Sequence, residues 1–84
     1  MKSTLYTLSE TRQVIYGPKV GSNWIYIRAT GNDCYIGGAD VTDSNGLNIK
    51  NGDTLSTFIE RGEVLYGVSK TGAHTVTVLE PSSA

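Results

Sequence analysis

The sequence predicts an all-β protein, and three observations support that fold class. Residues that favour strands are abundant, with ten threonines, seven valines, six isoleucines and five tyrosines among 84 residues. Ten glycines divide the chain at short intervals, as expected where short strands alternate with turns. No window repeats apolar residues with the spacing of an amphipathic helix. We therefore expect one domain over residues 1–84, an antiparallel β-sandwich or barrel of jelly-roll type with about seven or eight short strands.

The expected strands follow one another along the chain, separated by residues typical of turns. Their ranges are Leu5–Leu8, Gln13–Tyr16, Asn23–Thr30, Cys34–Gly37, Leu47–Lys50, Thr54–Glu60, Val64–Val68 and His74–Glu80. Gly17-Pro18 ends the second of them, because proline has no N–H to donate to a ladder. Asn45-Gly46 and Asn51-Gly52 are typical of tight hairpin turns, in which both central residues take positive φ. We expect residues 1–11 to form an N-terminal arm or an edge strand, and residues 81–84 to form a frayed tail.

Alternation along the strands assigns their two faces. In the third strand Ile25, Ile27 and Ala29 share one face, and this aliphatic set predicts the core face. The same rule points Val76 and Val78 inward in the last strand. The other sets expected to close the core are Leu55 with Ile59, Val64 with Tyr66 and Val68, and Ile36 with Leu47 and Ile49.

Charge and hydropathy exclude several partners. The net charge is −1 and the basic residues are scattered among acids, whereas a nucleic-acid-binding protein usually carries a basic face. No stretch approaches the roughly 20 apolar residues that span a membrane. Residues 1–13 contain no apolar run, so we expect no signal peptide and a protein made in the cytoplasm.

The acidic segment Asp40–Gly46 invites comparison with a calcium-binding loop. An EF-hand alignment that uses Asn45 as a ligand places Val41 at the first ligand position and Gly52 at the twelfth, and neither side chain can bind the ion. Asx-type turns explain the same acids and Asn45. A cation site of another kind is the alternative that this pattern leaves open.

No other residues form a recognisable chemical site. Gly37-Gly38 opens no helix and therefore predicts a bulge or tight bend instead of a phosphate loop. Cys34 and His74 are the sole thiol and imidazole, too few for a structural zinc site. As a nucleophile and base they lack an orienting third group, and a lone strand cysteine is typically a small core residue. We expect no enzyme activity, no cofactor and no metal.

The outer face of the third strand is the candidate binding surface. If Ile25 and Ile27 face the core, then Trp24, Tyr26 and Arg28 face outward. Tryptophan, tyrosine and arginine are enriched in interface hot spots. The alternative is that both faces of this strand are buried within one subunit.

Several motifs together resemble a family of small bacteriophage virion proteins, the capsid decoration (cement) proteins and the related modules of head fibres. They are Trp24-Ile25-Tyr26-Ile27-Arg28, Gly31, Tyr35-Ile36-Gly37-Gly38-Ala39-Asp40-Val41-Thr42, Asn45-Gly46-Leu47, Asn51-Gly52-Asp53-Thr54-Leu55, Leu65-Tyr66 and Thr75-Val76-Thr77-Val78-Leu79-Glu80. The similarity extends from about Arg12 to Glu80. Its sharpest part is the turn-forming motif that contains Gly37, Gly38, Asp40, Asn45 and Gly46.

The resemblance implies a compact β domain without enzyme activity on the outer capsid surface of a virion. Its implied partner is the major capsid protein, and decoration proteins are often symmetric homo-oligomers. A receptor- or carbohydrate-binding module of a head or tail fibre is the alternative, in which Trp24 and Tyr26 would stack on sugar.

Overall fold

The protein is a β-sandwich of eight strands in two antiparallel sheets, as seen in a computed structural model that describes residues 2–80. The strands are β1 (Lys2–Leu8), β2 (Gln13–Tyr16), β3 (Asn23–Ala29), β4 (Cys34–Gly37), β5 (Leu47–Ile49), β6 (Thr54–Ile59), β7 (Leu65–Val68) and β8 (His74–Glu80). Residues 2–80 contain no helix, which confirms the all-β prediction. The expected strand ranges agree to within a few residues, and the largest difference is the extension of the first strand back to Lys2. The tail expected over residues 81–84 lies outside the residues that the structure describes.

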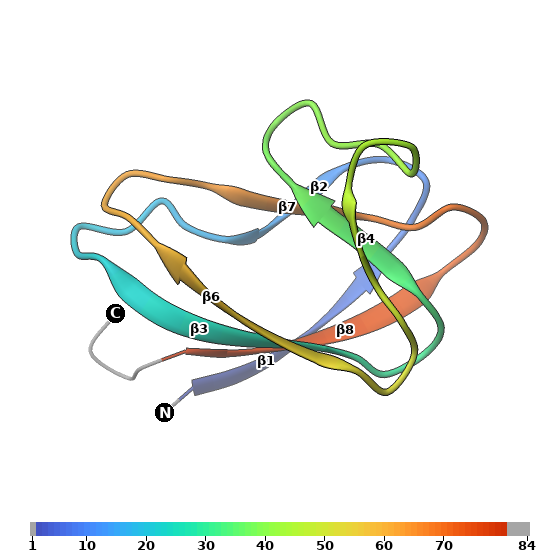
Figure 1. Ribbon diagram of the computed structural model, residues 1–84, viewed down its shortest axis with the longest axis horizontal. Coiled ribbons are helices and arrows are strands. Elements are labelled where there is room, and N and C mark those ends of the chain that lie inside the picture. The colour runs from blue at the N-terminus through green and yellow to red at the C-terminus, as the bar shows by residue number, and fades with distance from the viewer. Residues whose placement is uncertain (1, 81–84) are drawn as a thin grey trace.

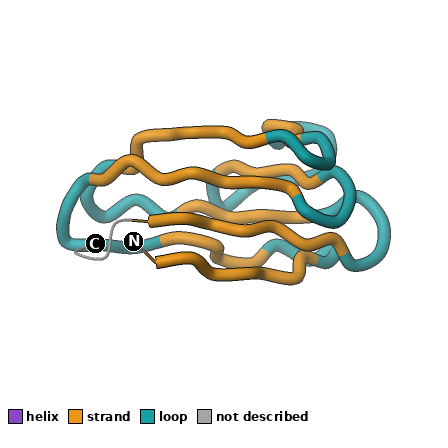
Figure 2. The backbone as a smooth tube through the Cα atoms, turned by 90° about the horizontal axis from the view of Figure 1, so that it is seen from below, coloured by secondary structure: helices purple, strands orange, loops and turns teal. Residues whose placement is uncertain are grey.

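The two sheets have the strand order of a jelly roll. One sheet runs β1-β8-β3-β6 and the other runs β2-β7-β4-β5. The chain passes from one sheet to the other at most of its turns, so strands distant in sequence become neighbours. Figure 1 shows the first sheet below the second, and Figure 2 looks onto the first sheet, with β1 along its lower border. The structure is thus a sandwich with four edge strands and not a closed barrel.

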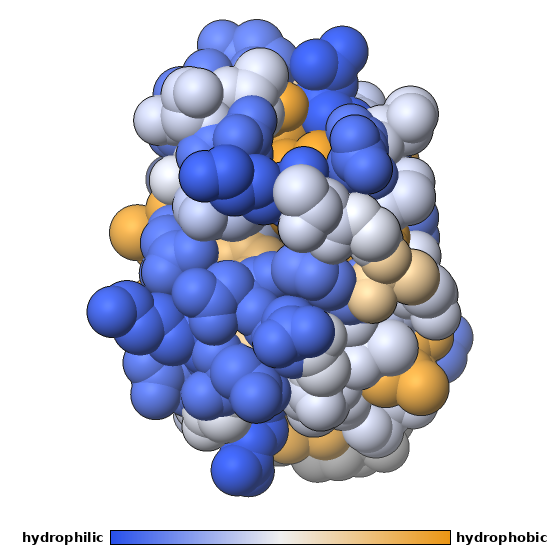
Figure 3. Space-filling view, turned by 90° about the vertical axis from the view of Figure 1, so that its right-hand side faces the viewer, coloured by the Kyte–Doolittle hydropathy of each residue, from blue (hydrophilic) through white to orange (hydrophobic). Residues whose placement is uncertain are grey.

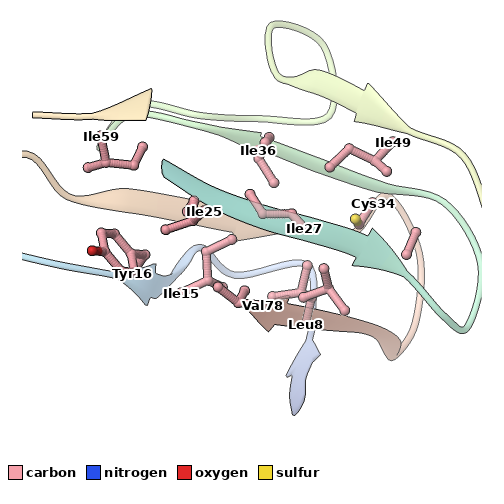
Figure 4. Packing of buried hydrophobic residues seen from close by; sticks show 12 residues of the cluster. Leu8, Ile15, Tyr16, Ile25, Ile27, Cys34, Ile36, Ile49, Ile59 and Val78 are labelled. Carbon is pink, nitrogen blue, oxygen red and sulfur yellow. The ribbon is translucent and has the colours of Figure 1, made fainter. Parts of the chain in front are cut away.

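The core lies between the sheets and is built from the inward residues of nearly every strand (Figure 4). Its buried members are Leu8, Ile15, Tyr16, Ile25, Ile27, Ala29, Cys34, Ile36, Ile49, Ile59, Val76 and Val78. Ile15 and Tyr16 are both buried because β2 shifts register against β7 between Val14 and Tyr16. The predicted inward faces of β3 and β8 are confirmed by this cluster.

Two predictions about the core are wrong. Leu65 and Gly67 face the core in β7, not Val64, Tyr66 and Val68. A Cβ on Gly67 would lie 3.0 Å from Leu8, so the neighbouring side chain fills the space that a residue at 67 would have taken. The alternation of large and small side chains did not predict the inward face of β7, because glycine at 67 has no side chain to mark that face. Leu47 is 56% exposed because β5 is short and only its last residue reaches the core.

Four of the turns that join the two sheets lie at one end of the sandwich, and the turns over residues 17–22 and 60–64 lie at the other end. Residues 9–12, 30–33, 50–53 and 69–73 lie on the right of Figure 1, and Figure 3 shows that this end is mainly hydrophilic. Asn51-Gly52 lies here, where Gly52 has φ of +88° and Asp53 N–H donates to the Lys50 carbonyl over 2.9 Å. The prediction of a hairpin at Asn51-Gly52 is wrong, because the turn carries the chain between sheets.

Candidate docking surface

The outer face of the β1-β8-β3-β6 sheet carries a group of exposed apolar side chains. Trp24 is 57% exposed and Tyr26 43%, and Arg28 is also exposed, so the predicted outward direction of all three is confirmed. Phe58 on β6 and Leu5 on β1 add 45% and 63% exposed side chains to the same face. We call this surface the aromatic face.

Strand register places the three aromatic residues of this face close together, whereas Leu5 lies opposite Thr77. Trp24 lies opposite Phe58, with ring centroids 5.5 Å apart and planes inclined at 60°, a tilted aromatic pair. Tyr26 lies between Leu79 of β8 and Ser56 of β6. The apolar groups are therefore contiguous across three neighbouring strands and not scattered.

The aromatic face is almost free of charge. Alternation places twelve side chains on it: Ser3, Leu5, Thr7, Trp24, Tyr26, Arg28, Thr54, Ser56, Phe58, Thr75, Thr77 and Leu79. Arg28 is the sole charged member of this set, between Thr77 and Thr54 in the strand register. It forms no salt bridge with any residue in the described range 2–80. A partner that covers this face would need few charged groups and one acceptor for the guanidinium.

A shallow groove crosses the same face. It is lined by Ser3, Tyr26, Arg28, Thr54, Thr77 and Leu79. Its walls are one aromatic ring, one leucine, one guanidinium and hydroxyl groups, so it offers stacking and hydrogen bonding but no pair of groups for acid–base catalysis.

The outer face of the other sheet is partly covered by the turn-forming motif. Residues 38–46 join the paired strands β4 and β5 and form the loop at the top of Figure 1. Within the loop Gly46 N–H donates to the Thr42 carbonyl over 2.9 Å, and Thr42 N–H donates to Asn45 Oδ1 over 2.7 Å. Asn45 Nδ2 donates to the Asp40 carbonyl over 3.2 Å. The Asn45 amide thus joins both ends of the loop.

Val41 is the residue that this loop buries. Its side chain is 2% exposed and lies against the outer side of β4, where a Cβ on Gly37 would come within 3.0 Å of it. Val68 on β7 is also buried, at 4%. Charged residues surround the two valines, since the adjoining recess is lined by Glu10, Thr11, Arg12, Val41, Thr42, Asp43, Val68, Ser69 and Lys70. Around Val41 and Val68, this sheet therefore covers its own outer face with apolar and charged groups from the same chain.

The prediction that Asn45-Gly46 is a two-residue turn with positive φ is wrong. Gly46 does not have positive φ, and the loop between β4 and β5 spans residues 38–46. Glycine is needed at 46 for space, because an added Cβ would lie 2.8 Å from Val41 and 2.9 Å from the Thr42 carbonyl oxygen. Gly37 is crowded by Val41 in the same way, whereas Gly38 has ordinary contact distances.

Cys34 and His74, the other residues considered for chemistry, are held in structural roles. Cys34 is 0% exposed, and burial, with a smaller contribution from nearby Asp33, raises the pKa of its thiol to about 11. His74 Nδ1 is hydrogen-bonded to the Asp33 main-chain carbonyl. Within residues 2–80 no group of three His, Cys, Asp or Glu side chains is placed to hold a metal ion. A protonated core thiol has no nucleophilic role at neutral pH.

Comparison with known proteins gives one structural relative. No family model and no curated protein matches the chain. A solved chain from Bacillus endospore appendages, which form a family of disulfide-linked pili, superposes with a TM-score of 0.62 at 16% identity. The match covers 96% of this chain and 85% of the appendage chain, so it shows a common fold over the whole domain. Residues 2–80 include no helix that could cross a membrane.

Proposed function

We propose that this chain is a non-enzymatic structural protein of a bacteriophage virion, a decoration protein that binds the major capsid protein on the outer shell. The observation that carries this proposal is the contrast between the two outer faces. One face is partly covered by its own loop, and the other presents Trp24, Tyr26 and Phe58 to solvent. A contiguous apolar patch of this kind marks an interaction site more often than ordinary surface. The virion assignment rests on the sequence resemblance described above.

Two general considerations agree with a decoration protein. A capsid shell presents many equivalent binding sites, so individually weak contacts gain strength when the bound protein is itself multivalent. The aromatic face is a sheet surface held by a buried core, so it requires no folding step to bind.

We do not propose for this chain the disulfide links of the Bacillus endospore appendages. Cys34 is the single cysteine of this sequence, and it is fully buried. A link between copies through Cys34 would require the core to open.

Copy number on purified particles tests the proposal. Virions of the phage that encodes the chain are banded on a density gradient, and the chain is quantified by mass spectrometry against the major capsid protein. We expect a fixed ratio on the order of one copy per capsid subunit or per capsomer, lost selectively with Trp24→Ala. Absence from the particle, or presence only in trace amounts, would refute the proposal.

A carbohydrate-binding module is the second candidate, and the groove favours it. Tyr26 borders the groove, while Arg28, Thr54 and Thr77 supply hydrogen-bonding groups along it. Exposed aromatic rings beside hydroxyl groups are able to stack on a sugar ring. A glycan array probed with the wild-type protein and Tyr26→Ala separates the two functions, because Tyr26 supplies the aromatic ring of the groove: a saturable hit lost in the variant supports the module.

A further inference from the structure

The edge strands of the two sheets differ in how they are protected from association. In the β2-β7-β4-β5 sheet, β2 carries a register shift and β5 has only 3 residues. In the β1-β8-β3-β6 sheet, β1 has 7 residues and β6 has 6, and both pair with continuous register. Bulges and short length are devices that blunt an edge, and long regular edges invite further pairing.

The main chain of β6 offers free hydrogen-bonding groups along its outer side. Ala29 N–H donates to the Asp53 carbonyl over 3.2 Å, which identifies Asp53 as a residue that bonds to β3. Because bonding alternates along an antiparallel strand, Thr54, Ser56 and Phe58 direct their N–H and C=O groups away from β3.

The main chain of β1 also has outward groups without a hydrogen-bond partner among residues 2–80. Thr30 N–H donates to the Thr75 carbonyl over 3.1 Å, so alternate residues of β8 from 75 onward bond to β3 and the others bond to β1. Tyr6, opposite Val76, therefore bonds to β8, and the outward groups of β1 belong to Ser3, Leu5 and Thr7.

The side chains at these two edges also leave the strands open to further pairing. No residue of β6 is charged, and the sole charge of β1 is Lys2 at its start. Tyr6 and Leu55 point toward the core from the two edges but are only partly buried against it. Both would become more buried if another strand were added at each edge.

We propose that copies of this chain join edge to edge, with β1 of one copy pairing antiparallel to β6 of the next. All pairs in this sheet are antiparallel, so β1 and β6 run in opposite directions and a translated copy presents the correct polarity. The register that pairs Leu5 with Ser56 of the neighbouring copy also places Tyr6 opposite the neighbour's Leu55. Pairing β6 with β6, or β1 with β1, about a twofold axis would leave these two side chains apart.

This contact has a consequence for assembly. It joins two different edges of each copy, so it is heterologous and generates a ring or an open row. Every copy keeps its aromatic face on the same side of the extended sheet. The contact is made by main-chain groups of the two edge strands, so it stands whether or not the aromatic face binds a capsid.

Disulfide trapping tests the pairing. Directly opposite residues in a hydrogen-bonded antiparallel pair have Cα atoms about 5.5 Å apart, a distance that a disulfide spans. Leu5→Cys, isotopically labelled, is mixed with unlabelled Ser56→Cys under mild oxidation, and the linked peptides are identified by mass spectrometry. We expect mixed Leu5→Cys/Ser56→Cys dimers several-fold above either homodimer. Asn48→Cys on the β5 edge replaces Ser56→Cys as the matched control, and wild-type protein reports any reaction of buried Cys34.

Two outcomes would overturn the proposal: no mixed dimer above the Asn48→Cys control, or a predominance of homodimers. Sedimentation gives an independent reading that needs no added cysteine. The wild-type protein should form a concentration-dependent series of oligomers, Ser56→Lys should shift it to monomer, and Asn48→Lys should leave it unchanged. A monomeric wild-type protein, or equal effects of the two lysines, would contradict the pairing.

Discussion

The two outer faces of the sandwich are both four-stranded antiparallel sheets, but a loop packs on one of them and the other is exposed to solvent. Behind the β2-β7-β4-β5 sheet, the loop of residues 38–46 buries Val41, and glycines at 37 and 46 leave room for it. The β1-β8-β3-β6 sheet has no covering segment among the described residues, and Trp24, Tyr26 and Phe58 stay exposed. The comparison teaches that the chain can cover part of a sheet face with its own residues, and that it leaves the aromatic face exposed.

The largest effect on stability is expected where the covering loop approaches its sheet most closely. Gly46→Ala places a Cβ 2.8 Å from Val41 and 2.9 Å from the Thr42 carbonyl oxygen. Overpacking of this kind typically costs roughly 1–3 kcal/mol of unfolding free energy. The matched control is Gly38→Ala, whose added Cβ would lie 3.6 Å from Asp40 Oδ1 and should change stability by less than about 0.5 kcal/mol. Equal melting temperatures for the two variants would show that the loop does not pack as described.

Removal of the covering side chain should have the next largest effect. Val41→Ala deletes two buried methyl groups, which corresponds to about 1.5–2 kcal/mol of unfolding free energy. Val20→Ala deletes the same atoms from a side chain that is 92% exposed and should be nearly neutral. Denaturant titration of both variants measures the difference, and a Val41→Ala midpoint equal to that of Val20→Ala would contradict burial of Val41.

The open face should respond in the reverse manner, with a small effect on stability and a large one on binding. Trp24→Ala loses its pairing with Phe58, which is worth about 0.5–1.5 kcal/mol in typical aromatic pairs. Binding to capsids should weaken tenfold or more, about 1.4 kcal/mol, as expected for a hot spot. Val14→Ala, a change of a 43% exposed residue on the other sheet, should bind normally. If Trp24→Ala unfolds instead, the aromatic face is part of the structural core; if the variant binds normally, the aromatic face is ordinary surface.

The smallest effect is expected from calcium. Asn45 Oδ1 already accepts the Thr42 N–H, so side chains of the 38–46 loop hold its shape without an ion. Addition of calcium chloride or a chelator should leave the melting temperature unchanged. A stabilisation that saturates with calcium would show that Asp40 and Asp43 bind the ion.

The sequence predicted the strands well because the relevant signals are local. Alternation in β3 separates Ile25 and Ile27 from Trp24 and Tyr26, and the structure confirms that division. The local signals failed where a distant residue decides the outcome. Gly67 faces the core because Leu8 and Ile15, which are far away in the sequence, fill the space above it. Asn45-Gly46 has the composition of a tight turn, but the packing of Val41 sets the loop. The strand order itself depends on pairs such as Leu5 with Thr77, which no local pattern specifies.

Hydroxyl-radical footprinting of the free protein and of capsid-bound protein tests the central claim most directly, because it reports both faces in one sample. Trp24, Tyr26 and Phe58 report the open face, and Tyr35 and Tyr66, which are partly exposed, report the covered one. On particles, oxidation of the first three residues should fall several-fold while oxidation of the two control tyrosines stays unchanged. Unchanged oxidation of Trp24 and Phe58, or protection confined to Tyr35 and Tyr66, would contradict the assignment of the aromatic face as the docking surface.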